Sequence, residues 1–258
     1  MKVELLPSSY SSSGRPSQRQ HLSCIILDDL IAFDAGSLAF SCSDAQREAI
    51  RDIVISHSHL DHIAGLPLYL DDLFSTLTEP VRVHATAEVI EVLERDLFNW
   101  AIYPKFSELK NANGPVLAYH PFVVHRPFKV RHLTFTAFDV NHMDSSIGAT
   151  ISDGKVTIGI TSDTASTNEI WAEFDKCAGL AAVLVECAFP DELSGLAGAS
   201  RHLTPSSLGL ELKKFGRKDV PVFAINLKPM FRDTIAQQIE ALSISNLKVL
   251  EIGRTYDF

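Results

Sequence analysis

The sequence has no long hydrophobic run: within its 258 residues, no apolar stretch reaches the roughly 18 residues that a membrane-spanning helix needs. Its opening stretch, MKVELLPSSYSSSG, contains one lysine but no apolar segment ahead of a small-residue cleavage site, so we expect no secretory signal. Cysteine is scarce, and no CxxC pair occurs among its four positions, which are Cys24, Cys42, Cys177 and Cys187. We therefore expect a cytoplasmic protein that does not bind membranes and whose thiols are reduced and mostly buried.

Positive charge is also in short supply. The formal net charge is −9 at pH 7. An extended polyanion such as tRNA would dock against net repulsion unless positive charge were concentrated in a patch. The only basic cluster has the spacing of a solvated helix end and consists of Lys213, Lys214, Arg217 and Lys218. A small-molecule substrate is therefore favoured over extended nucleic acid.

The sequence lacks repeats, low-complexity tracts and interdomain linkers. Its one stretch rich in serine, proline and glycine, PSSYSSSGRPSQRQ, is too short for a linker and is predicted to form a surface loop after a first strand. Hydrophobic residues make up 46% and charged residues 21% of the chain, as in an ordinary globular protein. We predict one α/β domain over residues 1–258.

Several predicted strands end in a polar residue. A hairpin in CIILDDLIAFDAG is expected to turn at Asp28 and Asp29, with Asp34 just after its second strand. Five further strands are RDIVIS, LTFTAFDVNH, KVTIGITSD, AAVLVE and VPVFAIN, which lead into or end at His57, His142, Asp163, Glu186 and Asn226. We expect these polar residues to gather along one rim of the sheets, where loops usually carry function.

Predicted helices fall between some of these strands. HIAGLPLYLDDLF follows the first histidines, TAEVIEVLERDLFNW is amphipathic, and MFRDTIAQQIEAL precedes a last strand, LKVLEIG. TPSSLGLELKKFG is expected to have Thr204 as its N-cap and Gly216 as its C-terminal stop. Strands that alternate with helices indicate an α/β fold.

The stretch HSHLDH crowds three histidines and an aspartate into six positions. Neutral imidazoles and carboxylates are the usual protein ligands of zinc, manganese and iron. His57 and His59, two apart on an extended loop, can reach one metal together, whereas Asp61 and His62 at a helix start would point toward a second. Four donors in six residues cannot all bind one ion without strain, so the stretch predicts two metal ions.

This His-x-His-x-Asp-His pattern after a strand resembles the signature of the metallo-β-lactamase superfamily. The resemblance continues along the chain, because FDAG at 33–36 is similar to the family's first strand pair and VNHMDSSIG supplies a third histidine, His142. GITSDT supplies Asp163, in the position of the aspartate that bridges the two metals in the family. The resemblance implies a single-domain αββα sandwich with two divalent metals at one edge of the sheets. Zn²⁺ is favoured, and Mn²⁺ or Fe²⁺ are alternatives.

The second half of the chain resembles the branch that contains class II cyclic-nucleotide phosphodiesterases and tRNase Z-type nucleases. The similar segments are VECAFPDELSGLAGASRHLTPSSLG and VPVFAINLKPMF, together with HLDHIAGLPLYL around the cluster. In that branch a glutamate at the Glu186 position partners a histidine at the His202 position, which protonates the leaving oxygen. The resemblance thus implies a phosphodiesterase that hydrolyses 3′,5′-cyclic nucleotides to 5′-monophosphates, with Asp61, Glu186 and His202 as catalytic residues. It also implies a homodimer.

The residue types suit that chemistry. A phosphodiester needs a nucleophile at neutral pH, charge neutralisation at phosphorus and a proton for the departing alkoxide. Two metals supply the first two by activating a water to hydroxide and by binding phosphate oxygens. His202, tuned by Glu186, can supply the proton. Taken alone, His202 could equally be a loop residue that caps the next helix.

One expected metal ligand is replaced. The resembling proteins have a histidine before Leu-Lys-Pro, and this chain has Asn226 there. Because an amide oxygen is a weak neutral donor for zinc, we expect a labile second metal that rests mainly on Asp61, His62 and Asp163. The alternatives are an altered protein and a member that binds nucleotide without efficient turnover.

Other polar residues have weaker interpretations. Asp34 could accept a hydrogen bond that orients a ligand imidazole, or it could be a turn residue before Gly36. Ser145 and Ser146 follow His142 and could touch substrate. Structural or surface roles are expected for His84, His120, His125 and His132. Residues 97–128 are aromatic-rich and match no motif, and they could form a lid or a dimer contact that stacks a base.

Two alternatives to the cyclic-nucleotide phosphodiesterase stay open. A tRNase Z-like ribonuclease that processes tRNA 3′ ends would commonly carry a long tRNA-binding arm between the third histidine and the bridging aspartate. Only residues 143–162 separate His142 from Asp163 here, which argues against that activity although some nucleases carry the arm elsewhere. The other alternative is a non-catalytic nucleotide-binding protein, which Asn226 motivates.

Overall fold

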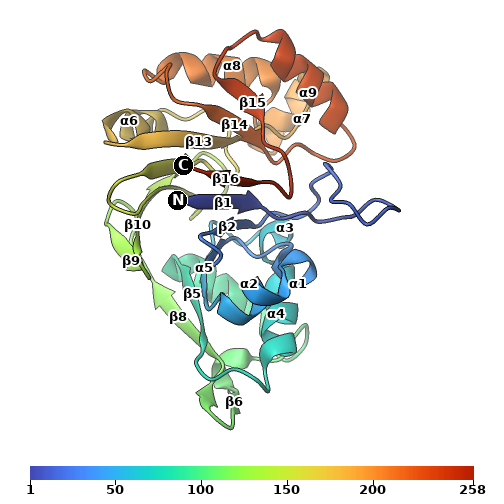
Figure 1. The fold of residues 1–258 in the computed structure, drawn as a ribbon, viewed down its shortest axis with the longest axis vertical. Coiled ribbons are helices and arrows are strands. Elements are labelled where there is room, and N and C mark those ends of the chain that lie inside the picture. The colour runs from blue at the N-terminus through green and yellow to red at the C-terminus, as the bar shows by residue number, and fades with distance from the viewer. The chain divides into compact units, whose positions relative to one another are not determined.

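The structure, a computed structural model, describes residues 1–258 and divides them into two compact units. Unit 1 consists of Met1–Ser17, Leu22–Val123 and Ile252–Asp257. Unit 2 consists of Gln18–His21, Val124–Glu251 and Phe258. Each unit contains its own seven-stranded sheet and its own helices (Figure 1). None of the helices is both long enough and apolar enough to cross a membrane. That the chain forms one domain over 1–258 stays a prediction.

Unit 1 is built on a mixed sheet in which the order is β16-β1-β2-β3-β4-β5-β8. Neighbours are antiparallel from β16 to β3 and parallel from β3 to β8. The strands are β1 (Lys2–Leu5), β2 (Ile25–Leu27), β3 (Ile31–Phe33), β4 (Asp52–Val54), β5 (Val81–Ala85), β8 (Leu117–Pro121) and β16 (Thr255–Asp257). A separate two-stranded ribbon pairs β6 (Lys110–Asn111) with β7 (Gly114–Pro115).

The predicted hairpin between β2 and β3 is confirmed. Its two turn residues, Asp28 and Asp29, have φ of 50° and 57°. Left-handed backbone at both central positions matches the twist of the flanking strands, and aspartate tolerates this conformation better than most side chains. The Asp28 carboxylate also accepts a hydrogen bond of 2.7 Å from the Lys2 backbone amide, which joins the turn to β1.

The helices of unit 1 bury their apolar sides in one core with the sheet. In this core Leu66, Tyr69 and Leu70 pack with strand residues such as Ile53 and Val83. The α-helices are α1 (Leu38–Ser41), α2 (Asp44–Ala49), α3 (Leu60–Ile63), α4 (Gly65–Leu73) and α5 (Ala87–Val92), followed by the π-helical turn η1 (Leu93–Leu97) and the 3₁₀ turn η2 (Phe106–Glu108).

Two predicted helices are interrupted in the structure. The helix expected in TAEVIEVLERDLFNW ends its α-helical part at Val92 and continues as η1, where the Phe98 amide donates to the Leu93 carbonyl at 2.8 Å. The helix expected in HIAGLPLYLDDLF is divided into α3 and α4 at Ala64. The helical character of both stretches was predictable, and their internal breaks were not.

The aromatic residues of 97–128, expected to form a lid or a dimer contact, are divided between the core and the surface. Phe98 and Phe106 are fully buried in the core of unit 1, with ring centroids 5.8 Å apart. Tyr119 packs partly against the same core. In the loop that follows η1, only Trp100 and Ile102 are large apolar residues on the surface, with exposed fractions of 58% and 66%. These aromatic residues therefore help to form the core of unit 1, and a lid or dimer contact made by the exposed part of 97–128 stays a prediction.

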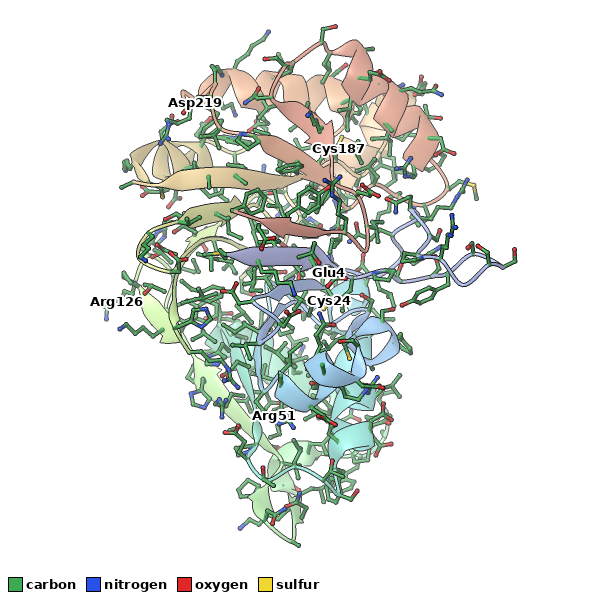
Figure 2. The ribbon with its side chains drawn as sticks, in the orientation of Figure 1. Glu4, Cys24, Arg51, Arg126, Cys187 and Asp219 are labelled. Carbon is green, nitrogen blue, oxygen red and sulfur yellow. The ribbon has the colours of Figure 1, made fainter.

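The four cysteines are free thiols, as expected from their spacing. Cys24 and Cys187 are fully buried in units 1 and 2 respectively (Figure 2), and Cys42 and Cys177 are half-buried. Burial raises the pKa of all four thiols, which keeps them protonated and unreactive at neutral pH.

Asp52 on β4 is a buried carboxylate that pairs with two basic side chains of β5. Arg82 donates two hydrogen bonds of 2.7 Å to this carboxylate, from Nε to Oδ1 and from Nη2 to Oδ2. His84 Nε2 lies 3.0 Å from Asp52 Oδ1. Burial alone would raise the pKa of Asp52, but the bonds from Arg82 and His84 outweigh it and hold this pKa well below its usual range. The structural role expected for His84 thus fits its contacts.

Replacing Asp52 with asparagine is expected to lower the free energy of unfolding by about 2 kcal/mol at pH 7, because the partly buried Arg82 fork loses its anion. A depressed pKa stabilises the fold above the unfolded pKa, so this difference should shrink as the pH falls below about 4. Denaturant unfolding of both proteins at several pH values measures it. Asp72→Asn, which removes the exposed partner of Arg47, is the control and should change little.

Unit 2 contains the second mixed sheet, with the order β15-β14-β13-β12-β11-β10-β9. Neighbours from β15 to β12 are parallel and those from β12 to β9 are antiparallel. The strands are β9 (Phe128–Val130), β10 (Leu133–Asp139), β11 (Ile147–Ser152), β12 (Thr157–Ile160), β13 (Leu180–Glu186), β14 (Val222–Ile225) and β15 (Leu247–Val249). Strands β10, β12, β13 and β14 run in one direction, so their C-terminal ends lie at the same edge.

The helices of unit 2 are α6 (Glu169–Lys176), the 3₁₀ turn η3 (Asp191–Leu193), α7 (Ser194–Ala199), α8 (Pro205–Lys214) and α9 (Arg232–Ala241). Figure 1 shows α8 and α9 lying beside strands β13 to β15. The predicted start of α8 is confirmed, because Thr204 caps it and its side chain accepts from the Ser207 amide. The helix ends at Lys214, two residues before the predicted stop at Gly216. Lys218 then donates to the Phe215 carbonyl.

Candidate metal centre

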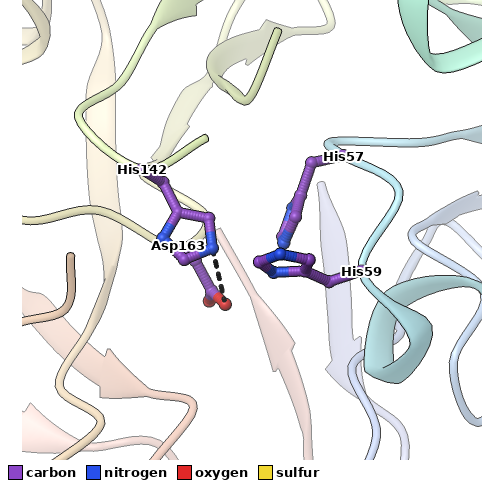
Figure 3. Close-up of side chains that lie close together, drawn as sticks. All are labelled: His57, His59, His142 and Asp163. Carbon is purple, nitrogen blue, oxygen red and sulfur yellow. Dashed lines mark ion pairs between the residues drawn. The ribbon is translucent and has the colours of Figure 1, made fainter. Parts of the chain in front are cut away.

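The HSHLDH stretch forms the loop after β4 in unit 1. Figure 3 shows His57 and His59 on this loop. Their ring centroids are 4.8 Å apart, and the centroid of the His62 ring lies 4.1 Å from that of His57. His57 and His62 are buried, whereas His59 is exposed and Asp61 half-buried. Asp61 and His62 lie in the first turn of α3. The predicted grouping of these donors within one loop is therefore present.

Gly36 of the FDAG stretch explains how this loop lies so close to β3. A Cβ atom at position 36 would stand 1.9 Å from the Asp61 carbonyl oxygen, so no larger residue fits. The neighbouring Ala35 amide donates to the His62 carbonyl at 2.8 Å. The FDAG backbone therefore serves as the platform on which the four donors are arranged.

Asp34 contacts two residues of the same loop. Its Oδ2 lies 2.7 Å from His62 Nδ1, and its carboxylate accepts hydrogen bonds from the Ser56 amide (2.8 Å) and hydroxyl (3.0 Å). The Ser56 hydroxyl donates its proton to Asp34, so a lone pair of Ser56 Oγ is left to accept from His57 Nδ1, which lies 2.9 Å from it. Both imidazoles thus have Nδ1 directed at an acceptor, which leaves Nε2 as the ring atom that can bind a metal.

The donors of unit 2 lie at the C-terminal edge of its sheet. His142 follows β10 and Asp163 follows β12, and His142 Nε2 is 4.0 Å from Asp163 Oδ2 (Figure 3). His142 Nδ1 donates to the Arg201 carbonyl at 3.0 Å, while Arg201 Nη1 donates to the His142 carbonyl at 2.6 Å. This reciprocal pair of bonds fixes the imidazole with Nε2 toward Asp163.

Glu186 and His202 form a buried pair next to Asp163. Glu186 ends β13 and is completely buried, and its Oε1 accepts from His202 Nδ1 and from the Thr164 amide, both at 2.9 Å. Its Oε2 accepts from the Ala188 amide at 3.0 Å. Potential ligand atoms of Asp163, Glu186 and His202 all lie within 4.8 Å of one another. The association predicted for Glu186 and His202 is thus present.

Burial and pairing set the protonation of this pair. Burial raises the pKa of Glu186, with the hydrogen bond from His202 opposing it. Burial alone would lower the pKa of His202, but its hydrogen bond to Glu186 outweighs this and raises that pKa above its usual value. Since Nδ1 is directed at Glu186, a proton on Nε2 is the one available for transfer.

Asn226 follows β14 at the same edge and has a left-handed φ of 59°. Its Nδ2 donates to Asp163 Oδ1. Its backbone amide donates to Gln20 Oε1 at 3.1 Å, which fixes the orientation of the Gln20 amide. Gln20 Nε2 is buried and has no hydrogen-bond partner. The predicted surface loop is thus wrong at this point, because Gln20 is packed inside unit 2.

The two donor sets suit a divalent metal by their chemistry. Each unit supplies histidines whose Nδ1 is held by an acceptor and at least one carboxylate beside them. Such nitrogen and oxygen sets are typical of zinc, manganese and iron sites. A divalent metal therefore fits both sets, and Asn226 contributes only an amide to the set of unit 2.

Other predicted residues lie in less informative places. Ser146 is buried, and its backbone and hydroxyl form hydrogen bonds with Met143 and Val140 that close the 140–146 loop. Its substrate contact stays a prediction. Ser145 is half-buried, and its substrate contact stays a prediction. The surface roles expected for His120, His125 and His132 agree with their exposure.

Comparisons with known proteins agree with the motifs. A family model described as "Beta-lactamase superfamily domain" matches residues 30–220, which is well over half of the chain. The chain also superimposes on unliganded yeast PDE1 with a TM-score of 0.77 at 17% identity, covering 98% of each chain. At this identity the likeness concerns the fold alone, and it confirms the predicted α/β metallo-β-lactamase fold class.

Two curated relatives carry activities in their names. The "Probable 3′,5′-cyclic-nucleotide phosphodiesterase" of Yersinia pestis is 27% identical over 229 residues, which cover 78% of this chain and 63% of that protein. The "Nuclear ribonuclease Z" of Triticum aestivum is 32% identical over 133 residues, which cover 51% of this chain and 69% of that protein. The chain thus spans less than two thirds of the length of the phosphodiesterase relative.

Proposed function

Because the chain belongs to the beta-lactamase superfamily, we propose that it is a metal-dependent phosphodiesterase that opens 3′,5′-cyclic nucleotides to 5′-monophosphates. The observation that carries this proposal is the buried Glu186–His202 pair, with its 2.9 Å hydrogen bond beside Asp163. A phosphodiester leaves an alkoxide that needs a proton, and a carboxylate-oriented imidazole provides one.

The proposed metal ligands come from both donor sets. As membership of the family implies, the ligands of two divalent ions would be His57, His59, Asp61 and His62 of unit 1 together with His142 and Asp163 of unit 2. Such ions, with Zn²⁺ favoured, lower the pKa of a water molecule and neutralise charge at phosphorus. Asn226 beside Asp163 would leave the second ion weakly held.

The residues of this chain then have separate tasks. Glu186 accepts from Nδ1 of His202 and so presents Nε2, whose proton passes to the departing 3′ oxygen as its bond to phosphorus breaks. The neutral imidazole that remains regains a proton from solvent. Asp34, Ser56 and the Arg201 carbonyl keep the ligand imidazoles in the orientation that exposes Nε2.

A small cyclic nucleotide is favoured over tRNA for two reasons. The net charge of −9 disfavours a long polyanion. Half of the segment 143–162 between His142 and Asp163 folds into β11 and β12, so the remainder is too short for a long tRNA-binding arm. The Yersinia pestis relative supports the same choice by its name. The homodimer implied by the family resemblance stays a prediction.

tRNA 3′ processing is the second candidate. It is favoured by the 32% identity to the wheat nuclear ribonuclease Z over 133 residues. The buried Glu186–His202 pair serves an RNA phosphodiester as well as a cyclic one, so the substrate decides between the two activities.

Parallel assays with Zn²⁺ or Mn²⁺ are expected to show hydrolysis of bis-p-nitrophenyl phosphate and of cyclic AMP or cyclic GMP, with precursor tRNA left intact. Chromatography of the products measures the rate of hydrolysis of each of the four substrates. The chelated protein is the control and should lose the activity. Cleavage of precursor tRNA without either cyclic nucleotide would instead establish the ribonuclease. Tight nucleotide binding with no hydrolysis of any phosphodiester would establish a binding protein.

A further inference from the structure

Glu211 on α8 is a buried carboxylate with no part in the chemistry above. Its Oε1 accepts from Ser166 Oγ at 2.6 Å and from Lys214 Nζ at 2.7 Å. Its Oε2 accepts from the Thr167 amide at 3.1 Å and from Trp171 Nε1 at 2.8 Å. Burial alone would raise the pKa of Glu211, but these donors, Lys214 foremost, lower it. Glu211 is therefore a fixed anion with four donors.

Two of the four donors belong to the loop that carries Asp163. This loop joins β12 to α6, and Ser166 and Thr167 lie in its second half. In the middle of the loop, directly after Asp163, the amide of Thr164 donates to Glu186 Oε1 at 2.9 Å. Two buried carboxylates thus hold the backbone on the C-terminal side of Asp163.

Asn141 extends the same network to the loop that carries His142. Its backbone amide donates to Thr164 Oγ1 at 3.1 Å, and its carbonyl accepts from the Ala165 amide at 2.8 Å. Its side-chain Nδ2 donates to the Ser166 carbonyl at 2.9 Å. Three hydrogen bonds therefore join the residue before His142 to residues 164–166, and the last of these, Ser166, also binds Glu211.

We propose that Glu211 is a positioning residue for the metal ligands His142 and Asp163. It acts through Ser166 and Thr167 on the loop of Asp163, and through Asn141 on that of His142. The inference rests on the proposed metal-binding role of these two ligands. Groups that orient metal ligands without touching the ion typically change metal affinity by about 10- to 100-fold when they are removed.

Glu211→Gln tests the proposal. Lys214, Thr167 and Trp171 can only donate to residue 211, so an amide at this position must turn its NH₂ toward at least one donor. Zn²⁺ affinity, measured on the full chain by competition with a chromophoric chelator, is expected to fall at least about 10-fold. Hydrogen exchange of the 164–167 amides should accelerate. For bis-p-nitrophenyl phosphate, kcat should fall with little change in KM.

Glu173→Gln is the matched control, because Glu173 on α6 forms an exposed pair with Lys176 and leaves the 163–168 loop untouched. This variant should keep the Zn²⁺ affinity of the parent protein. Ser166→Ala removes one of the four donors to Glu211, together with an acceptor for Lys214 at 3.1 Å. This variant replaces Glu211→Gln if that protein fails to fold, and it is expected to weaken Zn²⁺ binding in the same direction.

A folded Glu211→Gln protein with parental Zn²⁺ affinity and parental exchange would overturn the proposal, as would parental affinity in Ser166→Ala. Zn²⁺ binding is measured without substrate. Weakened binding in a protein that hydrolyses no phosphodiester would therefore support the role of Glu211 while the proposed function failed.

Discussion

Replacing His202 with alanine is expected to lower kcat for a cyclic nucleotide by about 100- to 10,000-fold, the usual contribution of a positioned general acid. The loss should be far smaller for bis-p-nitrophenyl phosphate, because p-nitrophenolate is a stable anion and departs without a proton. Steady-state kinetics of both substrates with the parent and variant proteins gives the two ratios. A difference between the ratios identifies proton donation as the lost function.

The dependence of kcat on pH provides an independent test of proton donation by His202. The pKa of His202 is raised by Glu186, so the acid form persists to higher pH than in an ordinary histidine. Cyclic-nucleotide hydrolysis should fall as the pH rises through that pKa, and the fall should vanish in His202→Ala. His125→Ala, an exposed histidine of the same unit, is the control. Equal losses for both substrates would contradict proton donation by His202.

Replacing Asn226 with histidine is expected to tighten the weaker metal site by about 10- to 100-fold. Asn226 now donates its Nδ2 to Asp163 Oδ1, which directs a hydrogen-bond donor at a carboxylate that is a proposed metal ligand. An imidazole would offer a nitrogen lone pair there instead. Histidine tolerates the left-handed backbone of position 226 about as asparagine does, so the fold should persist.

The measurement is the metal content after dialysis against limiting Zn²⁺, together with the turnover of bis-p-nitrophenyl phosphate. We expect metal content and turnover both to rise in Asn226→His. Asn168→His adds an exposed imidazole elsewhere in unit 2 and controls for adventitious binding. Unchanged occupancy and rate in Asn226→His would show that position 226 does not limit metal binding.

Much of the site was predictable because its residues follow strands. His57, His142, Asp163, Glu186 and Asn226 each lie at or just after the C-terminal end of a buried strand, and strand ends are readable from hydrophobic patterns. Parallel neighbours bring such ends to one edge of a sheet, which is what unit 2 shows for β12, β13 and β14. The family motif then assigned the chemistry.

Contacts made by backbone atoms or by segments remote in sequence were not predictable. The acceptor that orients His142 is the backbone carbonyl of Arg201. Because every residue type has a backbone carbonyl, the sequence does not indicate this contact. Gln20 lies in a polar stretch typical of a loop, yet its side chain is buried against Asn226. In the sequence, Glu211 is one polar residue of a predicted helix. Only the tertiary structure shows that its carboxylate binds the loop of Asp163.

Because β16 pairs with β1, the sheet of unit 1 contains strands from both ends of the chain (Figure 1). The order in which the chain is synthesised therefore affects when this sheet can be completed. The sheet of unit 1 begins with β1 at Lys2–Leu5, but its outer neighbour is Thr255–Asp257, which leaves the ribosome after nearly all of unit 2. Until then one side of β1 is an open edge whose amides and carbonyls can pair with another chain. Unit 1 therefore completes its sheet only after translation of residues 124–251, and a nascent chain that stalls in that interval carries a site for aggregation.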